Sequence, residues 1–351
     1  MNATALRTKT DALQNCGFVK TILMFCVILG HACAFWSGHW FTENPAIPSK
    51  GLNILYLWVN SFHIYAFALV SGYIFAYKVG GGGYDKYLPF LKTKVKRLLS
   101  PYLFVMAIWV APVSAHFFQW DMPYLARKYI LCVDPSQLWF LWMLFDVFAI
   151  IWPLRNVMMS EPIIGWLLSA LFYGAGLVGW KLSPNVFCIW SACQYVPFFH
   201  LGMRIRVKET TEKNDITAVA SWYGWIAADM FVFTCSTFVS EKVGVAWNLI
   251  RVCLNFTLHM TGTIMAWTTL QGLANCISWE GNKPFKILSS YSMPMYLFHQ
   301  QIIYFTIVWL NGKVNPWLNA GVNFTAAVTG SFLISAILMR WKFTRALVGE
   351  K

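Results

Sequence analysis

Apolar stretches long enough to cross a lipid bilayer follow one another along almost the whole of this chain. A transmembrane helix needs about 20 consecutive apolar residues and satisfies its own backbone hydrogen bonds in lipid. Only 12% of the residues are charged, against about 25% in soluble proteins, which excludes a soluble protein. We therefore predict an all-α, polytopic integral membrane helical bundle, with about ten transmembrane helices in one domain over residues 1–351. The predicted spans are 18–37, 54–77, 98–118, 137–154, 162–180, 185–203, 217–239, 246–270, 287–310 and 319–340.

Lysine and arginine are distributed unevenly between the segments that connect these spans. With the N-terminus inside, the inner segments hold 20 of the 27 Lys and Arg residues, and the outer loops hold 6. Positive residues mark the cytoplasmic side of a membrane protein and its anionic lipid, so the net charge of +13 indicates membrane lipids rather than nucleic acid. We predict a multi-pass protein of the cytoplasmic (inner) membrane with both termini cytoplasmic, residues 1–17 forming the N-terminal segment and residues 341–351 the tail.

The nine cysteines indicate neither a disulfide framework nor a zinc site. They lie mostly inside apolar runs, without a CxxC pair or a His/Cys ligand spacing. We predict that they pack as small apolar residues and that the chain binds no metal. The first apolar run lacks a small-residue cleavage site, because Phe35, Trp36 and Trp40 crowd its far end, so we expect it to remain as a signal anchor.

The first predicted span carries two polar residues, Lys20 and His31. A separation of eleven residues is close to three full helical turns, so both lie on one helix face, about 16 Å apart. His31 falls well inside the hydrocarbon zone, where an ionisable group is costly and is a functional candidate by default. The alternative is a neutral histidine that bonds to another helix and has no chemical role.

A basic segment runs directly into the third predicted span. Lys94 and Arg97 are three residues apart on one helix face, and Lys96 lies between them. Fixed cations at the membrane surface can hold a phosphate-bearing ligand, with Arg as a bidentate fork and Lys as a point charge. A topology signal or a contact with lipid headgroups accounts for the same residues equally well.

Other polar and aromatic groups in the spans are weaker candidates. His63 in the second span and His299 in the ninth are candidates for substrate contact or for simple packing. Trp139 and Trp142 open the fourth span, where a sugar can stack on the rings but an interfacial tryptophan belt is also expected. Further intramembrane polar residues that can pair, line a path or snorkel are Asp146, Asp229, Arg251 and His259.

Five motifs occur in order over nearly the whole chain: Lys20 and His31 with their spacing, FHIYAFALVSGYIF (62–75), KTKVKRLLSPY (92–102), LWFLW (138–142) and YSMPMYLFHQ (291–300). Together they resemble the membrane acyltransferase-3 family, in particular its capsular-polysaccharide or fucose O-acetyltransferase-like branch.

This resemblance implies roles for individual residues. The first-span histidine of that family, matched here by His31, is held to be catalytic, and an upstream arginine, matched by Lys20, assists it. An RxxR pair associated with acyl-CoA is matched by Lys94 and Arg97. Lysine keeps the charge of the two replaced arginines but loses the bidentate fork. The family's late acidic residue is matched here by Glu280, and we expect no appended hydrolase-like domain.

The expected activity is therefore that of a membrane-bound O-acyltransferase. It would transfer an acetyl group from acetyl-CoA, held by Lys94, Lys96 and Arg97, to a hydroxyl of a carbohydrate or lipid-linked glycan of the cell envelope. A neutral imidazole at His31 is a natural general base, since an unperturbed histidine titrates near pH 6.5. The main alternative is a transporter or flippase without acyl-transfer chemistry, and a third is a membrane sensor or scaffold. The acceptor can arrive from either membrane face.

Overall fold

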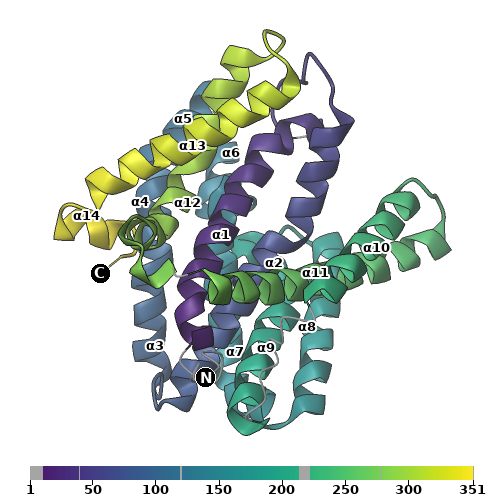
Figure 1. Ribbon diagram of the computed structural model, residues 1–351, viewed down its shortest axis with the longest axis vertical. Coiled ribbons are helices and arrows are strands. Elements are labelled where there is room, and N and C mark those ends of the chain that lie inside the picture. Colours follow the sequence, from purple (N-terminus) through teal and green to yellow (C-terminus); the bar gives the residue numbers. More distant parts are fainter. Residues whose placement is uncertain (1–10, 39, 119–120, 213–221, 278, 351) are drawn as a thin grey trace, which may run out of the picture.

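The computed structural model describes residues 11–38, 40–118, 121–212, 222–277 and 279–350, and these contain helices but no strand (Figure 1). The longest helices are α1 (Asp11–Ala34), α2 (Lys50–Gly80), α7 (Trp139–Ser160), α8 (Pro162–Leu182), α9 (Ile189–Glu212), α10 (Trp222–Ser240), α11 (Val245–Cys276), α12 (Lys283–Leu310) and α13 (Pro316–Leu338). The shorter α-helices are α3 (Tyr87–Lys94), α4 (Ser100–Val105), α5 (Ala111–Phe117), α6 (Met122–Leu125) and α14 (Lys342–Leu347). Single 3-10 turns lie at Phe35–Ser37, Ser136–Leu138, Val186–Cys188 and Trp279–Gly281.

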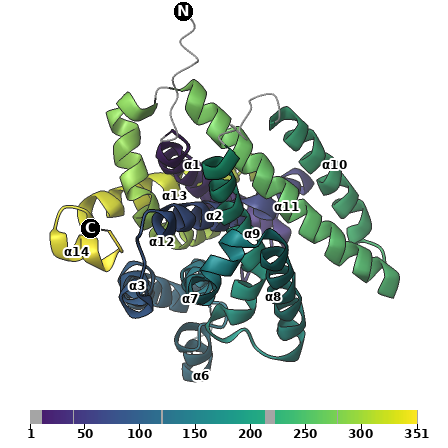
Figure 2. The ribbon, with the colours of Figure 1, turned by 90° about the horizontal axis from the view of Figure 1, so that it is seen from below.

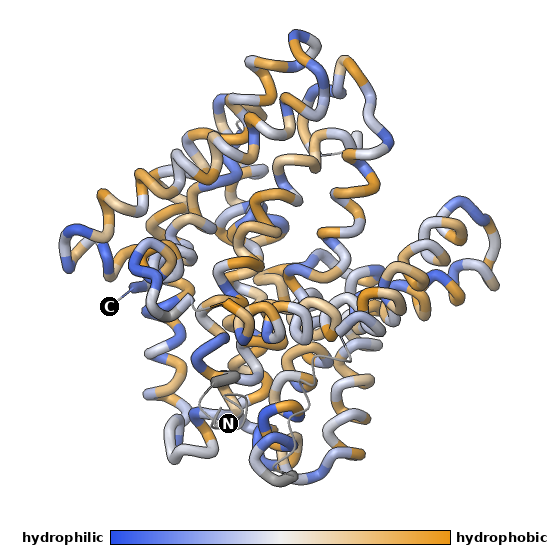
Figure 3. The backbone as a smooth tube through the Cα atoms, viewed as in Figure 1, coloured by the Kyte–Doolittle hydropathy of each residue, from blue (hydrophilic) through white to orange (hydrophobic). Residues whose placement is uncertain are grey.

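Every predicted span coincides with helical structure, which confirms the all-helical class. Eight helical segments of the described chain are long and apolar enough to cross a membrane, and Figure 3 shows apolar residues along their length and hydrophilic residues at many of the connections. Helices α10 and α12 also match predicted spans, although they are not among the eight. The first five residues of the predicted 217–239 span lie outside the described residues. The count of ten and the cytoplasmic location of both termini remain predictions.

Helices α1 and α2 lie at the centre of the bundle. α1 packs against α2, α11, α12 and α13, while α2 packs closely on α9, as the end-on view in Figure 2 shows. Two glycines make the contact between α2 and α9 possible. A Cβ atom on Gly72 would lie 1.9 Å from the carbonyl oxygen of Phe199, and one on Gly202 would lie 1.9 Å from that of Leu69. Any larger residue would force these two backbones apart.

The third span is one continuous helix, Tyr87–Phe117, which contains two π-helical segments, Val95–Leu99 and Met106–Val110. Each segment ends two residues before a proline, Pro101 or Pro112. Proline lacks an N–H and its ring clashes with the carbonyl four residues earlier, and a π segment is a common local adjustment. A third π segment is Ala126–Ile130. The basic segment thus lies inside the helix instead of preceding it, and its first π segment carries Arg97.

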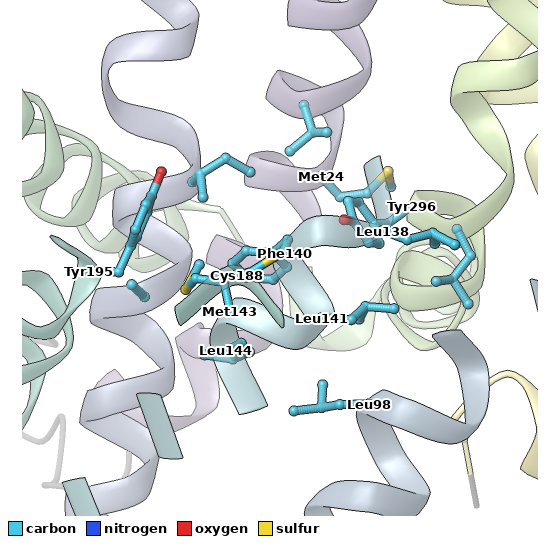
Figure 4. Packing of buried hydrophobic residues seen from close by; sticks show 14 of the residues in the cluster. Met24, Leu98, Leu138, Phe140, Leu141, Met143, Leu144, Cys188, Tyr195 and Tyr296 are labelled. Carbon is cyan, nitrogen blue, oxygen red and sulfur yellow. The ribbon is translucent and has the colours of Figure 1, made fainter. Parts of the chain in front are cut away.

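Large side chains from several helices fill the interior, and Figure 4 shows part of this core around the start of α7. The nine cysteines form no disulfide. Five of them are buried, as predicted for packing residues, but Cys253 and Cys276 are exposed on α11, where the prediction is wrong. Their surroundings are the outer surface of the bundle rather than its core.

Candidate active site

Two histidines from distant parts of the chain meet inside the bundle. Nδ1 of His31 on α1 lies 2.6 Å from Nε2 of His299 on α12. The two rings are nearly parallel, with 12° between their planes and 4.9 Å between their centroids. His299 is fully buried, and its Nδ1 lies 2.7 Å from the carbonyl oxygen of Tyr296. His31 is half-buried.

Aromatic rings and a third histidine surround this pair. The Trp40 ring stacks on His31 at 5.8 Å between centroids, and Tyr304 lies 5.2 Å from Trp40. His63 is buried on α2, donates from Nδ1 to the carbonyl of Val59 at 2.6 Å, and backs onto the α1 backbone at Gly30. His63 therefore supports the helix that carries His31, without a direct hydrogen bond to it.

A cavity of about 300 Å³ lies between α1, α2, α3, α7 and α12. It is lined by residues of α1 and α12 that precede His31 and His299 in these helices. Its walls are mostly apolar, and Figure 4 labels Met24, Leu98, Phe140, Leu144 and Tyr296 among the residues that line it. The polar lining includes four cationic side chains, one carboxylate and four serine hydroxyls: Lys20, Lys78, Lys94, Arg97, Glu350, Ser71, Ser289, Ser290 and Ser292. The cavity can hold an anionic group beside an extended apolar chain.

The cations of the cavity have few acidic partners. Within the described chain, no carboxylate lies within 4.0 Å of Lys20, Lys78, Lys94 or Arg97. The cavity lining therefore carries an excess of positive charge. An anion with several negative charges, such as a phosphate or diphosphate, complements such a site.

Lys94 is held in a box of aromatic rings. Its Nζ lies 3.4 Å from the ring centroid of Phe148, 5.2 Å from that of Tyr84 and 5.3 Å from that of Phe90. The electron-rich ring faces attract the ammonium group. The side chain is only 8% exposed, so its amino group is held in position on the cavity wall.

Glu350 reaches the cavity from the C-terminal tail. Gly349 beside it has a φ of +82°, and a Cβ atom there would lie 2.6 Å from the carbonyl of Arg97. The tail thus packs tightly against the start of the third span. Burial raises the pKa of the Glu350 carboxyl, and the charges of Arg97 and Lys20 oppose that shift.

The cavity ends one helical turn from the histidines. Val27 lines it and lies four residues before His31, while Tyr296 lines it and lies three residues before His299. One turn corresponds to about 5 Å along a helix axis. The site therefore joins a cationic cavity at one end of α1 to an imidazole pair farther along the same helix.

The remaining predicted residues lie elsewhere. Lys96 is exposed, and it does not line the cavity. Trp139 packs on Tyr195, and Trp142 packs on Tyr102 and Phe187. Neither tryptophan lines the cavity.

The polar groups without an assigned role lie apart from the cavity as well. Asp229 accepts hydrogen bonds from Trp58 and Thr261, and His259 bonds to the carbonyl of Ser61. Arg251 donates to the carbonyl of Lys242. One carboxylate oxygen of Asp146 is buried without a partner. The side chain of Glu280 lies outside the described residues.

Sequence reasoning did not find Lys78, Glu350 or Tyr296 as site residues. Tyr296 falls within the motif YSMPMYLFHQ (291–300). Lys78 lies at the end of α2 among the positive residues of the predicted inner segments, and this position gives only a weak signal for a site residue. Glu350 had no signal, because only the tertiary fold brings the tail to the cavity. No group of three or more His, Cys, Asp or Glu residues in the described chain could hold a metal ion.

A family model described as an acyltransferase domain, of the acyltransferase-3 type, matches residues 17–340. A search of curated proteins finds no match, and neither does a search of solved structures.

Proposed function

The chain belongs to this acyltransferase family, and on that premise we propose that it transfers an acetyl group from acetyl-CoA to a hydroxyl of a carbohydrate or lipid-linked glycan. The family match confirms the resemblance to the acyltransferase-3 family and supports acyltransferase activity in a multi-pass membrane protein. We further propose four details: a place in the capsular-polysaccharide or fucose-related branch, acetyl-CoA as the donor, a glycan as the acceptor, and the inner membrane as the location.

One observation carries the donor assignment: an apolar cavity with four cations ends one helical turn from a histidine pair. Acyl-CoA carries phosphates at one end and a thioester at the end of a long arm. Phosphates beside Lys20, Lys78, Lys94 and Arg97 would direct the arm along α1 toward His31. The distance of about 16 Å between Lys20 and His31 on the helix axis is comparable to the length of an extended pantetheine arm.

The chemistry requires a base for the acceptor hydroxyl. As the hydroxyl oxygen bonds to the thioester carbonyl carbon, a neutral imidazole of His31 takes its proton. The carbon–sulfur bond then breaks, and the proton passes to the leaving thiolate, giving an ester and free CoA. His31 thus has the role of general base, and the cations bind the donor and take no part in proton transfer.

Acetyl transfer by purified protein in lipid nanodiscs tests this function. We expect label from acetyl-CoA to appear in a sugar or lipid-linked glycan, or in free acetate when only water is present. A protein that binds and moves a glycan across vesicles without consuming acetyl-CoA would overturn the proposal in favour of a transporter. The family match does not favour that alternative.

A further inference from the structure

The hydrogen bonds of the histidine pair run in one direction. A carbonyl oxygen can only accept, so the 2.7 Å contact between Nδ1 of His299 and the carbonyl of Tyr296 requires a proton on that nitrogen. His299 is 0% exposed, and in the described chain no carboxylate lies within 4.0 Å of either imidazole. A buried charge without a partner is costly, so His299 is neutral and its Nε2 carries a lone pair.

This arrangement also sets the tautomer of His31. Nε2 of His299 accepts, so Nδ1 of His31 at 2.6 Å must be the donor. In a neutral imidazole only one ring nitrogen is protonated. The lone pair of His31 therefore lies on Nε2, the nitrogen that faces away from His299 within the ring.

We propose that His299 is a positioning residue that holds His31 in the tautomer whose Nε2 acts as the general base. The proposal rests on the proposed function, because it assigns a partner to the same base. When Nε2 takes the hydroxyl proton, the bond from Nδ1 to His299 remains and stabilises the imidazolium. The backbone carbonyl of Tyr296 accepts the second hydrogen bond and orients His299, as the third group of a catalytic triad orients the base.

Two near-isosteric variants separate this role from simple packing. Glutamine at position 299 has a carbonyl oxygen where Nε2 of histidine lies, so His299→Gln can still accept from His31. Asparagine carries its amide where Nδ1 lies, so His299→Asn can bond to the Tyr296 carbonyl but falls short of His31. His299→Leu removes both bonds.

The experiment measures kcat and the KM for acetyl-CoA of the three variants in nanodiscs. We expect His299→Gln to keep kcat within about 10-fold of wild type, and His299→Asn and His299→Leu to lose about 10² to 10⁴ in kcat. The KM for acetyl-CoA should change little, because the cavity lies one turn away. His200→Gln is the matched control, since His200 is also fully buried but bonds to Ser169 and Met158.

Each outcome decides one way. The positioning role of His299 would be overturned if the kcat of His299→Gln were no higher than that of His299→Asn, or if His299→Leu kept the kcat of wild type. In both cases turnover by the wild-type protein would leave the proposed function intact. If His299→Leu cannot be purified in folded form, the comparison of Gln with Asn decides alone. Absence of turnover in the wild type would instead reject the proposed function.

Discussion

Lys20 in the first helix and Glu350 in the C-terminal tail line the same cavity, although they lie near opposite ends of the chain. Lys20 adds a positive charge to a group of cations, and Glu350 is the one carboxylate in the described lining. The tail therefore places one negative charge on the cavity wall, which opposes the binding of anions. This charge balance leads to two predictions about the acyl donor.

Removing two cations should weaken donor binding selectively. We expect the double substitution Lys94→Gln and Arg97→Gln to raise the KM for acetyl-CoA by 10-fold or more, on the order of 1 to 3 kcal/mol for lost charge-assisted bonds. The KM for the acceptor should change much less. Steady-state kinetics with each substrate varied in turn provides the measurement.

Lys92→Gln is the matched control for this pair. Lys92 lies in the same helix, is exposed and does not line the cavity. Its substitution removes one positive charge from the same segment, where the double variant removes two, and it should leave both KM values unchanged. A double variant whose acceptor KM rises more than its donor KM would remove Lys94 and Arg97 from the donor site.

Removing the carboxylate should have the opposite effect. We expect Glu350→Gln to lower the KM for acetyl-CoA about 5-fold near neutral pH, corresponding to about 1 kcal/mol of like-charge repulsion. Because the pKa of this carboxyl is raised, it becomes neutral at a higher pH than an ordinary glutamate. As the pH falls through that pKa, the wild-type KM should approach the variant's.

The ratio of the two KM values at each pH is the quantity to measure. Protonation of the donor's own phosphates affects both proteins equally and cancels in the ratio. A ratio that stays constant from neutral to mildly acidic pH, or a variant that binds the donor more weakly, would contradict the role of Glu350.

His31 is the residue whose loss should abolish chemistry without loss of the fold. We expect His31→Ala to lower kcat by about 10² to 10⁴, the usual contribution of a general base, with little change in donor KM. Thermal unfolding should show a folded protein. His116→Ala is a suitable control, since His116 is an exposed histidine of α5. Near wild-type turnover in His31→Ala would reject the assignment.

Much of the fold was predictable from apolar length alone, because helices satisfy their own backbone in lipid. Helix α12 is, with α10, one of two exceptions, since it lies at a predicted span but is not among the eight segments that are long and apolar enough to cross a membrane. Its middle carries His299, Gln300 and Gln301, all buried against neighbouring helices. Hydropathy counts these groups as polar wherever they face, so it underestimates a helix whose polar side points inward.

The site was predictable only where residues share a helix. Lys20 and His31 follow from their spacing on α1, and Lys94 and Arg97 from theirs on the third span. The pairing of His31 with His299 depends on the packing of α1 against α12, which no local pattern specifies. Lys96 shows the limit of local reasoning, since it lies in the same basic run and is exposed outside the cavity.

The last prediction concerns the contact that brings α2 to α9 beside the cavity. Gly72 lies between Ser71 and Phe75, which line the cavity, and a Cβ atom there would lie 1.9 Å from the Phe199 carbonyl. Backbone atoms cannot yield as a flexible side chain can, so Gly72→Ala must separate the two helices. We expect a loss of about 3 kcal/mol or more.

The measurement is the Tm in detergent, which should fall by about 5 °C or more. Gly174→Ala on α8 is the matched control, because a Cβ atom there meets nothing within 4 Å. Alanine is favoured over glycine in a helix interior by about 1 kcal/mol, so this control should hold or raise the Tm. Equal Tm values for the two variants would mean that α2 and α9 are not in backbone contact. The walls of the cavity would then need another explanation, because six of the residues that line it belong to α2: Ile64, Phe67, Ser71, Ile74, Phe75 and Lys78.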